Sequence, residues 1–317
     1  MLHSISTRSV SAIIGLIVLS VMLAACGSPS DAASASASAA RGFPIAVMTG
    51  GSDSVTTVTI ESRPTRIVSL SPSATETLFA IGAEDEVVAV DSQSDYPDGV
   101  PITGLSGAQP DAQAIASYRP DLVVMAQEDS EVIAELAHEG VPTLVLPPAE
   151  ELSDVYDQIE RLGWATGRHR SASGLISTMK SAITSYLETS PDLDGTSYFL
   201  ELDPDLTTTS TQTFLGRLYG LFGITNIADD SGQPGDRPQL SDEYIIETDP
   251  DVIFLADAGC CDVTAGKLAE RPGWEGLQAI QKNQVFTADT DIANRWGPRV
   301  VDYVGMISGY LATVEDR

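Results

Sequence analysis

Histidine, cysteine, aromatic and basic residues are all scarce in this chain of 317 residues. It has 3 histidines and 3 cysteines, 6% aromatic residues, and 17 lysines and arginines against 45 acidic residues. Three cysteines are too few for a disulfide scaffold or a four-ligand zinc site. The scattered histidines (His3, His138 and His169) favour neither a zinc or manganese site nor a Ser-His-Asp triad. We therefore expect no catalytic residues, no metal site and no cofactor.

The excess of acidic residues gives a net charge of −28. Phosphate backbones repel such a surface, so nucleic acid is excluded as a partner. Anionic lipid is repelled as well, so attachment to a membrane requires a covalent anchor. The hydrophobic fraction of 43% is enough for a packed core. At ~150 residues per domain, the length predicts about two domains.

The first residues supply such an anchor. The apolar run at residues 10–23 is too short to cross a bilayer comfortably, and it predicts a signal peptide over residues 1–25. The sequence Leu23-Ala24-Ala25-Cys26 resembles the bacterial lipobox, in which the cysteine receives a diacylglyceryl group. An incidental cysteine after a plain signal peptide is the alternative. We expect lipidation of Cys26, a flexible tether over residues 26–63, and a location on the extracytoplasmic face of the cell membrane.

Beyond the tether, strand-like apolar runs alternate with helix-like segments. This alternation predicts an α/β fold with mostly parallel sheets. Strands are expected at residues 66–70, 86–92 and 196–202, helices at 71–82 and 213–223, and helix–Pro turn–strand units at 111–126, 130–147 and 241–256.

The second half of the chain repeats the first. Pro120-Asp121-Leu122-Val123 returns as Pro250-Asp251-Val252-Ile253, an offset of 250 − 120 = 130 residues. Between the copies, apolar residues at helical spacing predict one long helix. We expect two similar lobes, residues 64–167 and 191–317, joined by a helix at 168–190. A ligand site is expected between them, at the carboxyl ends of the strands.

Several segments in order resemble the iron-chelate and cobalamin binding proteins of ABC importers. They are RIVSLSPSATETLFAIG (66–82), DSQSDYP (91–97), IASYRPDLVV (115–124), QLSDEYIIETDPDVIF (239–254) and DIANRWGPRVVD (291–302). The resemblance implies the periplasmic binding fold with a helical backbone. It also implies a ferric siderophore, haem or cobalamin as ligand, and ABC permease subunits as partners.

The resemblance also implies residues that dock onto the permease. In that family one glutamate on each lobe meets an arginine cluster, and the motifs place these at Glu76 and Glu243. Both are expected in the first turn of a helix, where the helix dipole alone would also favour an acidic residue. Bidentate pairs between arginine and carboxylate would give docking its orientation.

Four residues are expected to contact the ligand. Tyr96 lies in a Ser-Asp-Tyr-Pro loop, and Arg295 and Trp296 lie in a loop that faces the cleft in relatives. Ser71 ends the first strand and could offer its hydroxyl at the cleft floor. The structural alternatives are packing for Tyr96, a loop-anchoring salt bridge for Arg295 and a core position for Trp296. Few cations lie in these loops, which leans towards cobalamin or a neutral chelate.

Cys260 and Cys261 are adjacent, close to the expected cleft rim. Outside the cytoplasm they could form a vicinal disulfide or remain reduced. The leading interpretation is the substrate-binding lipoprotein of an ABC importer. A secreted α/β hydrolase-like enzyme and a ligand-sensing surface lipoprotein without a transporter are the alternatives.

Overall fold

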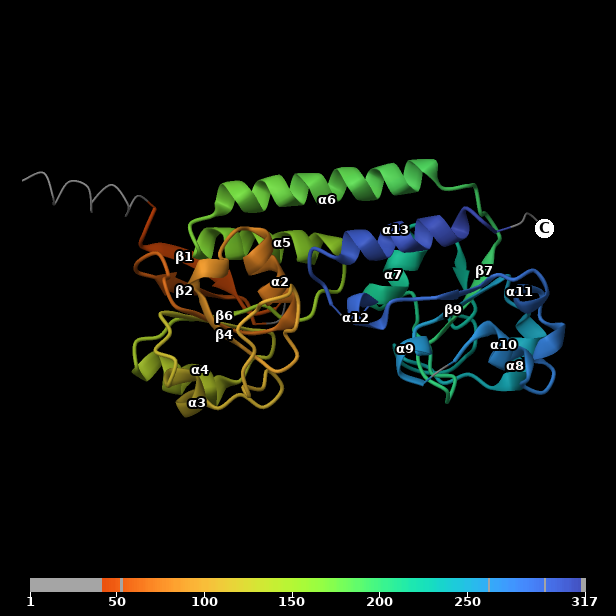
Figure 1. Ribbon diagram of the computed structural model, residues 1–317, viewed down its shortest axis with the longest axis horizontal. Helices are drawn as coiled ribbons and strands as arrows, with labels where there is room; N and C mark the ends of the chain where they lie inside the picture. Colours follow the sequence, from red (N-terminus) through yellow and green to blue (C-terminus); the bar gives the residue numbers. More distant parts are fainter. Residues whose placement is uncertain (1–41, 52–53, 262, 294, 315–317) are drawn as a thin grey trace, which may run out of the picture. The chain divides into compact units, whose positions relative to one another are not determined.

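The computed structural model of the protein describes residues 42–51, 54–261, 263–293 and 295–314. The first half is built on a parallel sheet with strand order β4-β3-β5-β6 (Figure 1). Its strands are β3 (Ile67–Leu70), β4 (Val87–Val90), β5 (Leu122–Met125) and β6 (Thr143–Val145). The helices are α2 (Pro72–Ala80), α3 (Ala112–Ala116) and α4 (Ser130–His138), with a 3-10 turn, η1, at Glu84–Glu86.

The second half has a parallel sheet of the same kind, with strand order β10-β9-β7-β8. Its strands are β7 (Ser197–Glu201), β8 (Thr225–Asn226), β9 (Val252–Leu255) and β10 (Val285–Thr287). The helices are α7 (Phe214–Gly220), α8 (Asp242–Thr248), α9 (Ala258–Cys261), α10 (Ala265–Ala269), α11 (Gln278–Gln281) and α12 (Thr290–Ala293), with η2 at Trp274–Gly276. The predicted α/β fold with mostly parallel sheets is confirmed.

The sequence repeat is also a structural repeat. Asp121 precedes β5 and accepts backbone hydrogen bonds from Thr65 and Arg66, whose chain enters β3. Asp251 precedes β9 and accepts the corresponding bond from Ser197 at the start of β7. Each aspartate thus satisfies backbone donors at the amino end of the neighbouring strand.

Three helices join and cover the two sheets: α5 (Leu152–Ala165), α6 (His169–Thr189) and α13 (Val300–Leu311). Helix α6 lies within the predicted range 168–190, and Met179 and Ile183 of its apolar stripe are buried. Helix α6 packs against α5 near its beginning and against α13 further along (Figure 1). The close packing of α5 on α6 requires Gly163, since a Cβ there would lie 2.4 Å from the Cβ of Ala172.

The inner strands of the two parallel sheets, β3, β5, β7 and β9, are buried on both faces, and alternate residues enter different cores. Val123 and Ile253 point into cores confined to their own half of the chain, together with Leu136 and Trp274 respectively. The next residues along these strands, Val124 and Phe254, enter a third core that runs through α6 and α13 into both halves, and Tyr198 on β7 belongs to the same core. This continuous burial explains why the strands read as unbroken apolar runs.

The predicted flexible tether over residues 26–63 is wrong for its last part. Residues 45–60 form an antiparallel hairpin of β1 (Ile45–Thr49) and β2 (Thr56–Ile60). The hairpin is held to β6, because Gly50 N–H donates to Val145 O at 2.9 Å and Val145 N–H donates to Thr49 Oγ1 at 2.7 Å. Burial of Val47 and Ile60 explains why the segment folds. The predicted signal peptide and Cys26 lie outside the described residues.

Candidate ligand-binding site

A cavity of 320 Å³ opens between the two halves, at the carboxyl ends of their strands. The chain leaving β6, the chain leaving β7, helix α7 and the loop before α13 all contribute to it. Its lining is mostly apolar, with one cation, Arg237; the residues are Pro148, Ala149, Leu202, Thr209, Thr213, Phe214, Leu215, Arg237, Ala293 and Trp296. Such a lining suits a largely neutral organic ligand with an extended apolar face.

Trp296 is the aromatic anchor of this cavity from the C-terminal part of the chain. Its backbone N–H donates to the hydroxyl of Ser73 on α2 at 3.1 Å. Its indole Nε1 is buried and has no hydrogen-bond partner among the described residues. A buried N–H without an acceptor costs free energy, so this donor favours a ligand or water that can accept from it.

An ionic cluster holds the loop that carries Trp296. The carboxylate of Glu76 accepts from Arg299 at 2.6 Å and from Arg295 at 3.4 Å. Asp291 pairs with both arginines, at 2.6 Å to Arg295 and 2.8 Å to Arg299. Asp95 pairs with Arg295 at 2.8 Å, and the hydrogen bond from this arginine lowers the pKa of Asp95. Burial disfavours the charged form of Arg299, yet its bonds to Glu76 and Asp291 raise its pKa above the ordinary value.

The two residues predicted to dock onto a permease lie in different settings. Glu243 is exposed in the first turn of α8, as expected. Glu76 lies in the second turn of α2 rather than the first, and its side chain is only 2% exposed. Docking through Glu76 would first require its ion pairs to break. The offset of 130 residues relates Glu243 instead to the exposed Gln113 on α3.

Of the four predicted ligand residues, only Trp296 lines the cleft cavity. Ser71 is buried and caps α2, accepting from Ala74 N–H at 3.3 Å. Arg295 is engaged in the ionic cluster. The ring of Tyr96 is 44% exposed and lies 4.1 Å from the guanidinium of Arg299, beside a separate cavity of 430 Å³. Tyr96 therefore packs on Arg299 of the loop that carries Trp296 and does not line the cleft cavity.

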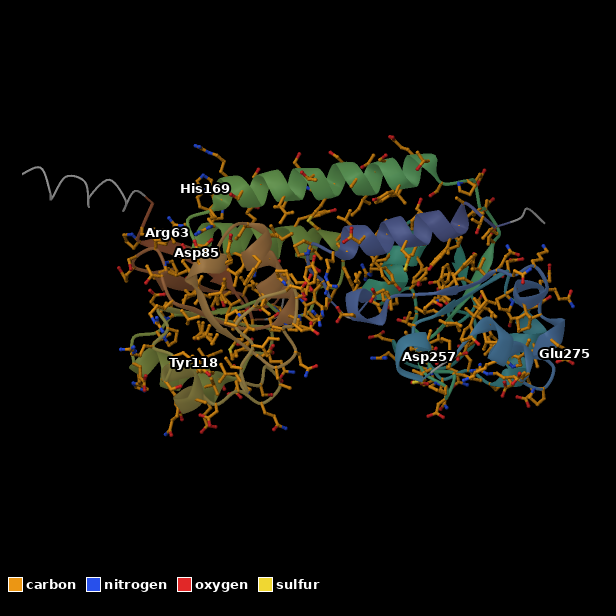
Figure 2. The ribbon with its side chains drawn as sticks, in the orientation of Figure 1. Arg63, Asp85, Tyr118, His169, Asp257 and Glu275 are labelled. Carbon is orange, nitrogen blue, oxygen red and sulfur yellow. The ribbon has the colours of Figure 1, made fainter. Side chains whose placement is uncertain are left out.

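Sequence reasoning missed a second ionic group, at the carboxyl ends of β7 and β9. Glu201 is fully buried next to the cleft residue Leu202, and Arg271 donates to its two oxygens at 2.6 and 2.7 Å. Burial raises the pKa of Glu201, and Arg271 opposes that shift. Burial also raises the pKa of Asp257, which lies beside α9 (Figure 2). A single glutamate at the end of the apolar run SYFLE was the available sequence signal.

The cysteine pair lies just beyond this group, in α9. Cys261 is disulfide-bonded. The side chain of Cys260 lies outside the described part of the chain, so the vicinal pairing stays a prediction.

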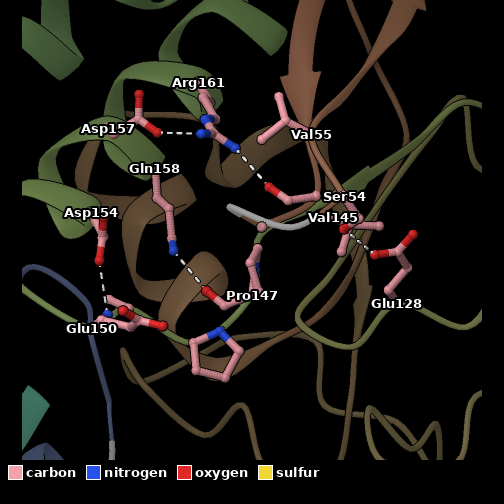
Figure 3. Close-up of a pocket in the computed structure, with 14 residues that line it drawn as sticks. Ser54, Val55, Glu128, Val145, Pro147, Glu150, Asp154, Asp157, Gln158 and Arg161 are labelled. Atoms are coloured by element: carbon pink, nitrogen blue, oxygen red, sulfur yellow. Dashed lines mark hydrogen bonds and ion pairs between the residues drawn. The ribbon is translucent and has the colours of Figure 1, made fainter. Parts of the chain in front are cut away.

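A larger cavity of 510 Å³ lies beside the hairpin turn in the first half (Figure 3). Its polar groups largely satisfy one another: Arg161 pairs with Asp157, Gln158 donates to Pro147 O, and Ser54 donates to Glu128. It shares Pro148 and Ala149 with the cleft cavity, so the two adjoin. The cleft cavity is the better candidate because both halves of the chain build it.

Metal ligands are not gathered in the part of the chain that the structure describes. No group of three or more His, Cys, Asp or Glu residues there could hold a metal ion. His138 ends α4, and the ring of His169 stacks on Trp164 with 4.6 Å between centroids. None of the described helices is both long and apolar enough to cross a membrane.

The chain has two α/β halves, each with a parallel sheet, joined through one long helix and with a cavity between them. This is the architecture of a two-lobed binding protein. Comparison with known proteins identifies its family. The profile of the periplasmic binding protein family matches residues 67–292. The chain is 32% identical over 301 residues to the uncharacterized ABC transporter substrate-binding lipoprotein YvrC of Bacillus subtilis, covering 91% of this chain and 92% of that protein. The chain therefore belongs to the periplasmic binding protein family, which confirms the resemblance seen in the sequence.

Other relatives carry ligand names. A cobalamin-binding protein of Halobacterium salinarum is 29% identical over 277 residues, covering 84% of this chain and 74% of that protein. Among solved structures, the vitamin B12 binding protein BtuF of Vibrio cholerae has a TM-score of 0.66 at 24% identity, covering 80% of this chain and 99% of that one. The haem binding protein HutB of Vibrio cholerae has a TM-score of 0.68 at 20% identity, covering 77% and 97%. These two structures support the fold.

Proposed function

We propose that the protein is the lipid-anchored substrate-binding subunit of an ABC importer, and that it captures a metal-organic chelate in the cleft. The observation that carries this proposal is the mostly apolar cavity built by both halves around Trp296. Family membership supports a role in binding rather than catalysis.

Cobalamin is the first ligand that we propose. Among the residues that the structure describes, the cavity lining offers no His, Tyr, Met or Cys side chain that could bind a haem iron axially. Arg237 is the single cation among the described lining residues, and it provides little charge for a polyanionic siderophore. Relatives named for cobalamin or vitamin B12 support the same choice. The cavity of 320 Å³ would hold only part of so large a ligand, so the rest of the ligand would extend beyond it.

Isothermal titration of the protein with cobalamin, haem and several ferric siderophores tests the proposal. We expect saturable binding of cobalamin, and a loss of ~1–3 kcal/mol of binding free energy in Trp296→Ala, as for buried aromatic anchors. Trp164→Ala is the matched control, because Trp164 is exposed and stacks on His169 away from the cleft. Binding of haem or a siderophore instead of cobalamin would show that cobalamin is the wrong ligand. Equal effects of the two substitutions would contradict a role of Trp296 in the site.

Docking onto a permease is proposed through Glu243 on α8, with α3 of the other half as its structural counterpart. Glu243→Gln should leave chelate binding intact and reduce uptake, since an exposed carboxylate can pair with a partner's arginine. Glu131→Gln, an exposed first-turn glutamate on α4, is the control. Normal uptake by the Glu243 variant would contradict docking at this residue.

A further inference from the structure

The loop Arg295–Arg299, which precedes α13, is fastened to the first half of the chain at several points. Arg295 donates to the backbone oxygen of Gln93 at 3.1 Å, and Trp296 N–H donates to the hydroxyl of Ser73. Gly297 lies so close to α2 that a Cβ would come within 3.0 Å of Glu76 Oε2. The loop thus packs directly on α2, although 219 residues separate Glu76 from Arg295.

Glu76 is the centre of this attachment. Its Oε1 accepts from both arginines, and Oε2 is buried without a partner among the described residues. A buried carboxylate is costly unless cations hold it, so the two ion pairs strongly favour one position of the loop. The two arginines lie on either side of Trp296 in the sequence, one residue before it and three after it. Fixing both arginines therefore also fixes the tryptophan between them.

We propose that Glu76 and Ser73 are positioning residues for Trp296: from α2 they hold the Arg295–Arg299 loop so that the indole is presented to the cleft. The inference rests on the proposed function, because it assigns these residues a role in chelate binding. Glu76 then acts within the protein and does not bind a partner protein. Because the Arg295–Arg299 loop is bound to Glu76 and Ser73 on α2, Trp296 moves together with α2 when the spacing of the two halves changes.

The chain supplies a close control for the carboxylate. Glu86, in η1, is also held by two arginines, Arg63 at 3.1 Å and Arg168 at 2.8 Å. Arg63 precedes β3 and Arg168 caps the start of α6, so this cluster does not involve the Trp296 loop. Glu86→Gln should cost stability in the way a structural ion pair does, without touching the cleft.

Hydrogen exchange and isothermal titration of the full chain test the proposal together. In Glu76→Gln we expect exchange of the amides at 295–300 to become at least tenfold faster, and the affinity for cobalamin to fall at least fivefold. Glu86→Gln should lower the melting temperature while both quantities stay at the wild-type level. Unchanged exchange in a folded Glu76→Gln protein, or faster exchange with undiminished affinity, would overturn the proposal.

Ser73→Ala keeps the test open if Glu76→Gln does not fold. It removes only the acceptor of the Trp296 amide, so exchange of that amide should quicken, and wild-type exchange would overturn the role of Ser73. Failure of the proposed function is distinguishable. A wild-type protein that binds none of the tested chelates would reject chelate capture, and with it the positioning of Trp296 for a chelate. Exchange at 295–300 would still show whether Glu76 holds the loop.

Discussion

Replacing Arg271 by methionine should destabilise the protein in a way that depends on pH. Arg271 is the cation that holds the fully buried Glu201 through two short hydrogen bonds. Methionine fills similar space but leaves the carboxylate without its countercharge. Removing one partner of a buried ion pair typically costs about 3–5 kcal/mol.

The carboxylate can limit this cost by taking up a proton. With an unfolded-state pKa of about 4.3, protonation at pH 7 costs ~1.36 × 2.7, or about 3.7 kcal/mol, and at pH 5 about 1 kcal/mol. Glu201 either stays charged without a partner or takes up a proton, and the alternative with the smaller free-energy cost dominates. We therefore expect the free energy of unfolding to fall by about 3–4 kcal/mol at pH 7 and by about 1 kcal/mol at pH 5. Loss of the contact between Arg271 and the Trp274 ring, 4.6 Å away, adds ~0.5–1 kcal/mol at either pH.

The sign follows from linkage. Loss of Arg271 raises the folded-state pKa of Glu201 further above its unfolded value. The folded variant then binds more protons at Glu201 than the unfolded chain does, so the contribution of this group to stability is present below about pH 4 and is lost as the pH rises.

Urea unfolding of the wild type and the Arg271→Met variant at pH 5 and pH 7, followed by circular dichroism, measures both losses. Arg63→Met is the control, since Arg63 is about half exposed and pairs with Glu86 at the surface. An equal loss at the two pH values would refute the reasoning about Glu201, as would a loss below ~1 kcal/mol at pH 7.

Two further predictions concern packing and attachment. Gly216→Ala should lower stability by ~1–3 kcal/mol, because a Cβ there would lie 2.0 Å from Ser210 O. Gly220→Ala on the same helix meets no atom within 4 Å and should be neutral or stabilising. Thermal unfolding compares the two variants, and equal melting temperatures would contradict the clash. Cys26→Ser should move the protein from the membrane fraction to the soluble fraction after cell fractionation, and retention in the membrane would reject the lipid anchor at that residue.

Much of the fold could be predicted because its information is local. The strands β5 and β9 are apolar runs that each follow a Pro-Asp pair, β3 is a short apolar run between two prolines, and the linking helix α6 carries a regular apolar stripe. The β1–β2 hairpin was missed because its glycine-, serine- and threonine-rich sequence is typical of a linker. Only its contacts with β6 show why it is ordered.

The site was harder to predict because it depends on distant pairs. In the sequence, Glu76 resembles an exposed residue near a helix start. Its burial depends on Arg295 and Arg299, which lie near the other end of the chain. Glu201 and Arg271 are 70 residues apart in the same way. Trp296 was recognised through its motif, but its contact with Ser73 could not have been deduced from spacing.

The third core, which runs from β5 through α6 and α13 to β7 and β9, has a consequence for how the protein unfolds. Two lobes with separate interiors would melt in two steps, each with its own enthalpy. Here Leu122, Met179, Tyr198 and Tyr303 belong to one buried cluster, so neither lobe can lose its packing without exposing apolar surface of the other. Calorimetry should therefore record one cooperative transition, and a ligand held in the cleft should raise the melting temperature of the whole folded unit rather than of one half.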